Sequence, residues 1–286
     1  MNIPFDVLKI VASYITKHKM KLLDWIDIKK LDRMHLAENP NAIDLLEINL
    51  NKINWMSLSA NPNAIHLLEA NPDEISWGQL SSNPNAICLL EDNINKIMWF
   101  YLSENPNAIK LLEANPDKIY WPLLSKNTNA IILLEKNKQN INMGQLSANP
   151  NAIKLLETNI NDINWNCLSM NKNAIHILEQ NINKINWELL SENPNAIHLL
   201  ENNLDKINWT NLSKNPNAIR IIEANLDKIR WKALSLNPNA IHILKANNNK
   251  IHWSYLSRNP SIFEPETKQY NINLQNQIII LDKIIN

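Results

Sequence analysis

The chain has 286 residues, of which 28 are Lys or Arg and 28 are Asp or Glu, so its formal net charge is zero. A protein that follows nucleic-acid phosphates normally carries a basic excess or stripe, and the balanced charge argues against nucleic acid as a partner. The two cysteines, Cys88 and Cys167, offer no disulfide framework and no zinc spacing. Their scarcity favours a reducing, intracellular setting.

Several functional classes are excluded by missing motifs. The chain has two glycines, Gly78 and Gly144, whereas a P-loop or a dinucleotide fingerprint needs two or three at close spacing. The sequence contains no nucleophile elbow, no His-Glu-x-x-His and no Cys-x-x-Cys. No apolar run reaches the roughly 18 to 20 residues of a membrane helix. We therefore expect a soluble, non-enzymatic protein without cofactor or metal.

The first element in chain order is a segment over residues 1–30. Its opening, Ile3-Pro4-Phe5-Asp6-Val7-Leu8, starts with proline and continues as an amphipathic helix. It is similar to the first helix of an F-box, Leu-Pro-x-Asp-Val-Leu followed by a spaced Ile and Tyr-Leu. That resemblance implies docking on a Skp-type adaptor of a cullin ubiquitin ligase. The docking residues would be Ile3, Pro4, Val7, Leu8, Val11 and Ile15. The alternative is a segment that only caps the rest of the chain.

Residues 31–260 form an array with a period of 22 residues. Tryptophans mark the period, with Met143 in place of one of them, and Asn-Pro marks a second position in every unit except those with Thr128 or Lys172. The marker tryptophans are Trp55, Trp77, Trp99, Trp121, Trp165, Trp187, Trp209, Trp231 and Trp253. A fixed period of 20 to 50 residues indicates units that bury their apolar faces only against their neighbours.

Within one unit, the pattern predicts a first helix from about Pro62 to Ala70. Asn61 would be its N-cap and Pro62 its first residue. Asn71 would end the helix, where asparagine tolerates the left-handed conformation. A second, shorter helix through Trp77 and Ser81 would follow, capped by Ser76 or by the asparagines at the same position in other units, Asn54, Asn164, Asn186 and Asn208.

These elements predict an all-α fold, an α-solenoid of about ten two-helix repeats with atypical capping ends. With helices stacked roughly 8 to 10 Å apart, the array would form a rod or superhelix on the order of 80 to 100 Å long. The tail over residues 261–286 contains the apolar run Ile278–Leu281, which would cover the last repeat. Self-association through this run is the alternative.

Candidate binding residues are sought where the repeats differ. One column in the first helix contains His176, His198, Arg220 and His242, and is interpreted as a solvated face, with a basic binding stripe or a metal site as alternatives. A Glu column, Glu47 to Glu223, is expected to pair with a Lys column that includes Lys96 and Lys184. In the second helix, Phe100, Tyr101, Tyr120 and Leu123 form the densest outward apolar group and a candidate protein-binding patch.

The unit Trp-x-x-Leu-Ser-x-Asn-Pro-Asn-Ala-Ile-x-Leu-Leu-Glu-x-Asn, found from Trp187 to Asn203, resembles Asn/Pro-rich repeats of proteins from mimivirus-like giant DNA viruses. The resemblance covers about residues 31 to 260 and implies the host cytoplasm or a virus factory as location. The leading hypothesis is a scaffold that binds proteins through its variable positions. A ligase adaptor and a structural virion component are the alternatives.

Overall fold

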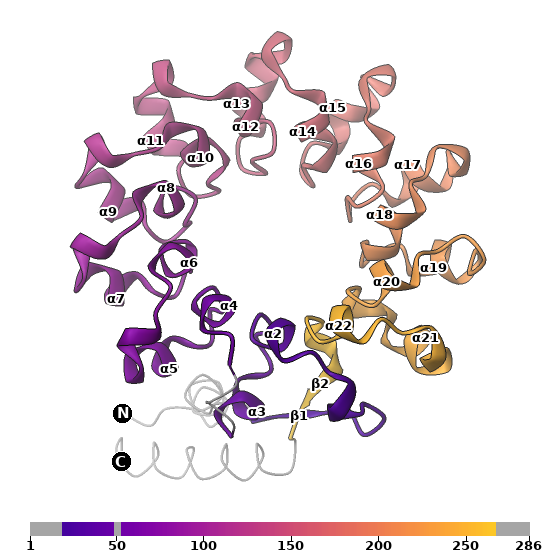
Figure 1. Cartoon of the computed structure of the whole chain (residues 1–286). Helices are drawn as coiled ribbons and strands as arrows, with labels where there is room; N and C mark the ends of the chain where they lie inside the picture. The colour runs from indigo at the N-terminus through magenta and orange to yellow at the C-terminus, as the bar shows by residue number, and fades with distance from the viewer. Residues whose placement is uncertain (1–18, 49–52, 267–286) are drawn as a thin grey trace, which may run out of the picture.

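In the computed structural model, which describes residues 19–48 and 53–266, the chain forms a closed ring of two helical layers (Figure 1). The inner layer of this described part contains eleven helices, which carry the Trp-x-x-Leu part of a unit, with Arg33 in α2 and Met143 in α12 in place of the tryptophan. They are α2 (Arg33–Leu36), α4 (Trp55–Ser59), α6 (Trp77–Ser82), α8 (Trp99–Leu102), α10 (Trp121–Lys126), α12 (Met143–Leu146), α14 (Trp165–Met170), α16 (Trp187–Leu190), α18 (Trp209–Lys214), α20 (Trp231–Leu234) and α22 (Trp253–Leu256).

The outer layer contains ten helices over the described residues, which carry the Ile-x-Leu-Leu-Glu part. They are α3 (Ile43–Glu47), α5 (Ile65–Ala70), α7 (Ile87–Glu91), α9 (Ile109–Glu113), α11 (Ile131–Lys136), α13 (Ile153–Thr158), α15 (Ile175–Glu179), α17 (Ile197–Glu201), α19 (Ile219–Glu223) and α21 (Ile241–Ala246). One leucine from each layer of every central unit, such as Leu80 and Leu90, is fully buried. The core is therefore a band between the layers.

Short 3-10 turns return the chain from the outer to the inner layer in most units. They are η1 (Ile28–Lys30), η3 (Pro72–Glu74), η4 (Ile94–Lys96), η5 (Pro116–Lys118), η6 (Lys138–Asn140), η7 (Ile160–Asp162), η8 (Ile182–Lys184), η9 (Leu204–Lys206) and η11 (Asn248–Lys250). Two more, η10 (Pro238–Ala240) and η12 (Pro260–Ile262), follow an inner helix. The isoleucine after most return turns, such as Ile97 or Ile119, is buried and anchors the turn, while Ile141 is partly buried.

A ladder of buried asparagine side chains joins the units. The side-chain amide of Asn83 donates to the carbonyl oxygens of Ser59 and Asn61 in the preceding unit, both at 3.0 Å. Its Oδ1 accepts from the backbone N–H of Asn85 at 3.0 Å. The same asparagine recurs every 22 residues from Asn39 to Asn259, always 2% exposed or less. Asn83 thus gives the Ser59 carbonyl a donor that it would otherwise lack, and gives the Asn61 carbonyl, which also accepts the Ala64 N–H, a second one.

Two further contacts repeat beside this ladder. The hydroxyl of the buried serine in each unit donates to the tryptophan carbonyl four residues back and accepts the N–H that starts the next inner helix; Ser81 bonds in this way to Trp77 and Met98. A second asparagine, such as Asn85, donates to the carbonyl of Pro62 in the preceding unit. Every unit boundary is therefore held by backbone-directed bonds that do not depend on the variable residues.

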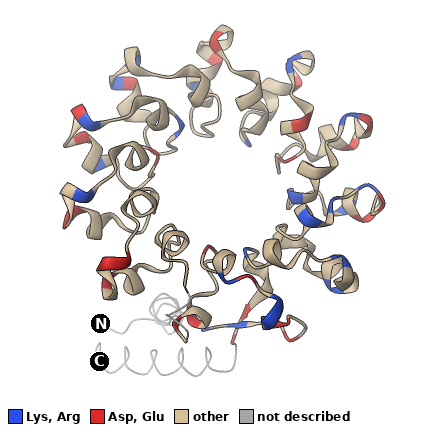
Figure 2. Ribbon diagram, in the orientation of Figure 1, with Lys and Arg blue, Asp and Glu red and all other residues tan. Residues whose placement is uncertain are grey.

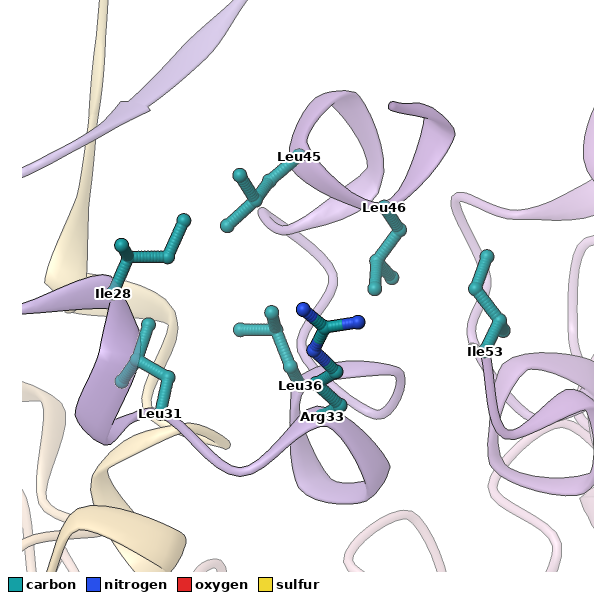
Figure 3. Close-up of a pocket in the computed structure, with 7 residues that line it drawn as sticks. All are labelled: Ile28, Leu31, Arg33, Leu36, Leu45, Leu46 and Ile53. Atoms are coloured by element: carbon teal, nitrogen blue, oxygen red, sulfur yellow. The ribbon is translucent and has the colours of Figure 1, made fainter. Parts of the chain in front are cut away.

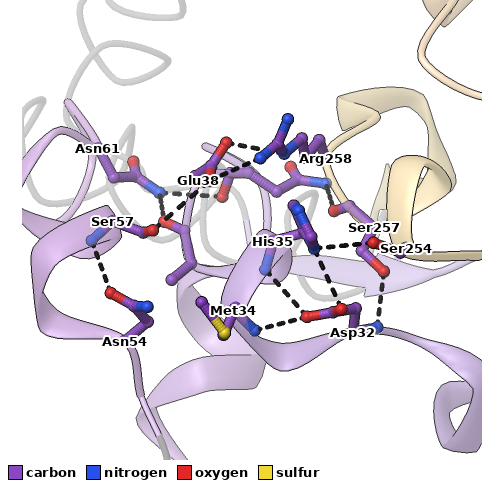
Figure 4. A network of polar contacts seen from close by, with 12 residues as sticks. Asp32, Met34, His35, Glu38, Asn54, Ser57, Asn61, Ser254, Ser257 and Arg258 are labelled. Atoms are coloured by element: carbon purple, nitrogen blue, oxygen red, sulfur yellow. Dashed lines mark hydrogen bonds and ion pairs between the residues drawn. The ribbon is translucent and has the colours of Figure 1, made fainter. Parts of the chain in front are cut away.

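The ring closes because the first unit bonds to the last in the same way. Asn39 donates to the carbonyl oxygens of Ser257 and Asn259, both at 2.9 Å, and the N–H of Asp32 donates to the Ser257 hydroxyl at 2.8 Å. Asn41 donates to the Pro260 carbonyl at 3.0 Å. Figure 4 shows part of this seam. The expected open rod with capped ends is wrong, since the array has no free end among the described residues.

The eleventh unit is assembled from both ends of the chain. After η12 the helix that other units form is replaced by β2 (Phe263–Pro265), which pairs antiparallel with β1 (Met20–Leu22). Residues 28–30 then supply the return turn that leads to α2. Lys30 lies 5.0 Å over the Trp253 ring, where Lys250 lies over Trp231 in the preceding unit. The segment before the array thus completes its last unit.

Curvature follows from unequal packing in the two layers. Neighbouring inner helices, such as α6 and α8, pack directly on each other, while the outer helices fan apart (Figure 1). Eleven units close a full circle when each rotates by about 33° relative to the last, the small per-unit rotation that gives repeat arrays their shape. A short serine and a half-buried tryptophan on the inner side permit this close approach.

Three local expectations need correction. The outer helix starts at Ile65 instead of Pro62, because Asn61 uses its side chain for the ladder and for the Asn63 N–H instead of capping the helix. Asn71 has φ −136° and ψ 65°, so it is not left-handed, and its amide donates to the Leu67 carbonyl. Ser76 makes no capping bond, whereas the asparagines at its position, such as Asn54 and Asn164, do cap.

Replacement of one ladder asparagine is expected to destabilise the whole ring. In Asn149→Asp, a buried carboxylate would face the carbonyls of Ser125 and Asn127, which lose their donor. The unpaired Ser125 carbonyl and an uncompensated charge predict a loss of about 3 kcal/mol or more, although Asn127 keeps the Ala130 N–H. Asn151→Asp, on the exposed ladder, should cost about 1 kcal/mol or less. Urea unfolding measures both; equal losses would contradict the ladder's assigned role.

A disulfide across the seam is expected to stabilise the ring. Lys21 and Glu264 are direct partners in the β1–β2 ribbon, so Lys21→Cys with Glu264→Cys places two thiols at neighbouring positions. The bond would close a loop of most of the chain, for which chain entropy predicts up to about 5 kcal/mol. Thermal unfolding with and without reductant measures the gain. If the oxidised variant unfolds at the same temperature as the reduced one, β1 and β2 do not pair.

Candidate functional site

The densest exposed aromatic group lies on the inner layer, at the start of α8 and α10. Phe100 is 47% exposed, Tyr101 41% and Tyr120 43%. The Phe100 ring centroid lies 5.2 Å from that of Tyr101, edge to face, and 4.7 Å from that of Tyr120. Leu123 is half-buried beside them on α10. We call Met98, Phe100, Tyr101 and Tyr120 the aromatic patch.

The aromatic patch forms at a cost to local stability. Met98 and Tyr120 occupy the N-cap position at which Asn54, Asn142, Asn164, Asn186 and Asn208 bond to the backbone of their helices. Neither Met98 nor Tyr120 makes such a bond, and Met98 is 50% exposed. An asparagine cap is worth about 1 kcal/mol over an apolar residue. Two adjacent units thus give up a cap and expose apolar surface in its place.

The histidine column lies on the outer layer, away from the aromatic patch. His176 in α15, His198 in α17 and His242 in α21 each bond through Nε2 to a glutamate of the preceding unit, at 3.0, 2.6 and 2.9 Å. Arg220 occupies the same position in α19. These side chains are about half exposed, so each pair contributes less than about 1 kcal/mol. The structure brings together three of the eight predicted binding residues, Phe100, Tyr101 and Tyr120.

The expected pairing of the glutamate and lysine columns is wrong. The glutamates of four units pair with histidines, as Glu47 does with His66 at 2.7 Å. Lys118 pairs with Asp117 at 3.8 Å, and other lysines of the return turns lie over tryptophan rings of the preceding unit, with Lys96 4.6 Å from the Trp77 centroid and Lys184 4.5 Å from that of Trp165. Such contacts are worth about 0.5 to 1 kcal/mol when exposed. Both columns are therefore used between neighbouring units.

A Ser-His-Asp group occurs at the seam, but it lacks catalytic geometry. The Ser254 hydroxyl lies 2.9 Å from His35 Nδ1, and Asp32 Oδ2 lies 3.1 Å from the same atom (Figure 4). A catalytic triad requires the serine at Nε2 and the aspartate at Nδ1. Here both partners compete for one nitrogen. The group, with the Glu38–Arg258 ion pair at 2.9 Å, joins the first unit to the last.

Cys167 is equally unsuited to covalent chemistry. Burial raises the pKa of the Cys167 thiol, with a smaller opposing effect from Lys126. A nucleophilic cysteine needs the opposite change, a lowered pKa that favours the thiolate. Over residues 19–48 and 53–266, no group of three or more His, Cys, Asp or Glu side chains converges on a point that could hold a metal ion.

A small cavity of about 70 Å³ marks the first unit, where Arg33 stands at the tryptophan position. It is lined by apolar residues, and Figure 3 shows the Arg33 side chain among them. The lining residues are Ile28, Leu31, Leu36, Leu45, Leu46 and Ile53. The cavity is a packing defect beside the seam and holds no converging polar groups.

Comparison with known proteins gives one family. The family model described as "Periplasmic copper-binding protein (NosD)" matches residues 41–207, which is 167 of 286 residues and more than half of the chain. The chain belongs to this family. The search of curated proteins and that of solved structures each returned no match. The matched region of this NosD-family chain includes the aromatic patch and ends before the seam residues on α22.

The copper in the family's description was tested against the described residues. Copper sites use converging Cys, Met and His ligands. Cys88 lies on the outer helix α7 and Cys167 on the inner helix α14, several units apart in the ring. The outer-layer histidines His66, His176, His198 and His242 occur one per unit, each with one glutamate. These residues do not fit a copper centre.

Two predictions from the sequence fall on the ends of the chain. The docking candidates Ile3, Pro4, Val7, Leu8, Val11 and Ile15, and the apolar run Ile278–Leu281, lie outside the described residues. Within the described part, no helix has both the length and the apolar character required to cross a membrane. The F-box resemblance therefore stays a prediction.

The seam is expected to weaken in acid through Asp32. Burial disfavours its charge, but hydrogen bonds from the His35 N–H, the His35 side chain and the Met34 N–H outweigh burial and lower the pKa of Asp32. A group with a lowered folded pKa stabilises above its unfolded pKa, about 4 for Asp, and this stability is lost as the pH falls through the folded value. Asp32→Asn, which cannot titrate, is the control.

Urea midpoints of wild type and Asp32→Asn measure this effect between pH 7 and pH 2. The wild type should be the more stable above about pH 4, and the difference should shrink below it. A difference that stays constant across this range would show that the Asp32 charge contributes nothing to closure.

Proposed function

We propose that the ring is a non-enzymatic scaffold that binds a protein partner through the aromatic patch on its inner layer. The observation that carries this proposal is the exchange of two helix caps, at Met98 and Tyr120, for exposed apolar side chains. Local rules of stability are broken most often where function requires it. Exposed aromatic residues are also the commonest binding hot spots.

The remaining surface supports the same assignment. Figure 2 shows charged residues concentrated on the outer layer and its turns, while much of the inner layer lacks charge. Glu104, just after α8, and Lys126, at the end of α10, pair with each other at 2.7 Å. An uncharged aromatic surface desolvates at low cost when a partner covers it. The Trp, Leu, Ser and Asn positions are occupied by packing and ladder contacts.

The copper and the periplasm named in the family description are not carried over to this chain, because its described His and Cys residues do not converge. The proposal keeps the host cytoplasm or a virus factory as the location, in line with the resemblance to giant-virus repeats. The ligase adaptor remains an alternative that depends on residues 1–30. Loss of Skp copurification on their deletion would support it, and a pull-down without Skp would end it.

Affinity purification with quantitative mass spectrometry tests the proposal. A tagged ring is compared with Phe100→Ser/Tyr101→Ser and with Ile132→Ser, a control in the outer helix α11, where Ile132 is 68% exposed. We expect the inner variant to lose its main partner about tenfold or more, as for hot-spot residues worth about 1.4 kcal/mol or more. The control should retain it. Equal recovery from both variants, with unchanged thermal unfolding, would refute the proposal.

A further inference from the structure

A second distinctive group lies at the same repeat positions on the other side of the ring. Arg230 and His252 occupy the N-cap positions of α20 and α22, where neither makes a capping bond, and both are exposed. Lys232 on α20 and Arg33 on α2 are also exposed. We call Arg230, Lys232, His252 and Arg33 the basic sector. Here too, two units give up a cap, this time for basic side chains.

Two side chains of the basic sector contact an aromatic ring, and none of its Lys or Arg side chains forms an ion pair with another described residue. The Lys232 ammonium lies 4.8 Å over the Tyr255 ring, and the His252 ring packs edge to face against the same tyrosine at 4.9 Å. The ion pairs between described residues include neither Arg230, Lys232 nor Arg33. Asp32, which precedes Arg33 in the chain, binds His35. The sector therefore presents positive charge available to a partner.

The two groups face each other across the ring. The aromatic patch lies on α8 and α10, the fourth and fifth inner helices, and the basic sector begins at α20, the tenth of eleven. Figure 1 shows these helices on opposite sides, with no described helix or strand between them. Eleven helices spaced about 9 Å apart form a circle of roughly 16 Å radius at their axes, which leaves an opening about 20 Å wide.

We propose that the ring receives, at the rim of this opening, one protein segment that is apolar on one side and acidic on the other. Its apolar side contacts the aromatic patch and its carboxylates contact the basic sector. The inference rests on the proposed function and adds the chemistry and orientation of the partner. A helical hairpin has the width to touch both sides at once, since each helix is about 10 to 12 Å across.

Single-stranded nucleic acid would also use aromatic and basic residues, but in a different arrangement. Such sites interleave stacking rings with cations along one groove, because each nucleotide carries both a base and a phosphate. Here the rings and the cations are separated by nearly half the ring, and the chain has no net positive charge. The separation matches a partner whose apolar and charged groups are themselves on different sides.

The test uses the full chain and three defined probes. They are a designed helical hairpin with Leu and Phe on one face and Glu on the other, the same hairpin with Lys for Glu, and a labelled 15-nucleotide single strand. Fluorescence anisotropy measures the binding of each to wild type, Arg230→Glu/Lys232→Glu and Phe100→Ser/Tyr101→Ser. Ile132→Ser is the matched surface control. Circular dichroism establishes that each variant is folded.

We expect the acidic hairpin to bind wild type at least tenfold tighter than the basic one. The preference should reverse in the Arg230→Glu/Lys232→Glu variant and weaken with added salt. Equal binding of both hairpins, lost only when the aromatic residues are replaced, would overturn the inference and leave the proposed function standing. Binding of neither hairpin would overturn the inference, while the partner purification decides the proposed function separately. If the oligonucleotide binds tighter than either hairpin and the charge reversal abolishes its binding, the inference is also overturned.

Discussion

The two-carbonyl hydrogen bond of the buried asparagine is the contact on which the ring depends. One side-chain amide has two N–H donors, and in each unit both are used on carbonyls of the preceding unit, as Asn83 shows with Ser59, which has no backbone donor, and Asn61, which also accepts the Ala64 N–H. Its oxygen accepts a third bond from its own turn. No other side chain of this size offers two donors and an acceptor in one plane. The 22-residue period keeps this geometry in register.

The ring closes because the same asparagine hydrogen bond repeats over a whole number of units. A ladder that advances by a fixed rotation either continues as a helix or meets itself, and it meets itself only after a whole number of units. Here the Asn39 amide donates to Ser257 and Asn259 as the Asn83 amide donates to its own preceding unit. Because no end of the described ladder faces water, the ring does not need the polar terminal repeats of open arrays. The split eleventh unit joins the ends without a covalent bond.

The sequence predicts the all-helical unit well and the assembly poorly. The period, the two helices and the buried leucines follow from local patterns that tertiary contacts do not reverse. The ring does not follow, because the rotation between units is a sum of small packing differences that no single residue encodes. The role of Asn61 was mistaken for the same reason, since its preference for N-caps describes bonds within a helix, and its partners Ala37 and Asn39 lie in the unit before.

The sequence predicted the aromatic residues of the candidate site but not their placement in the ring. Phe100, Tyr101 and Tyr120 stand out as aromatic residues at variable positions, but only the closed ring places them on an inner wall with Arg230 and Lys232 across from them. A closed ring also fixes the distance between its two sides, whereas an open array could flex. Fixed spacing reduces the entropy that binding must overcome. The asparagine ladder holds neighbouring units at a fixed distance. Closure of the ring likewise holds the variable residues on its opposite sides at a fixed distance.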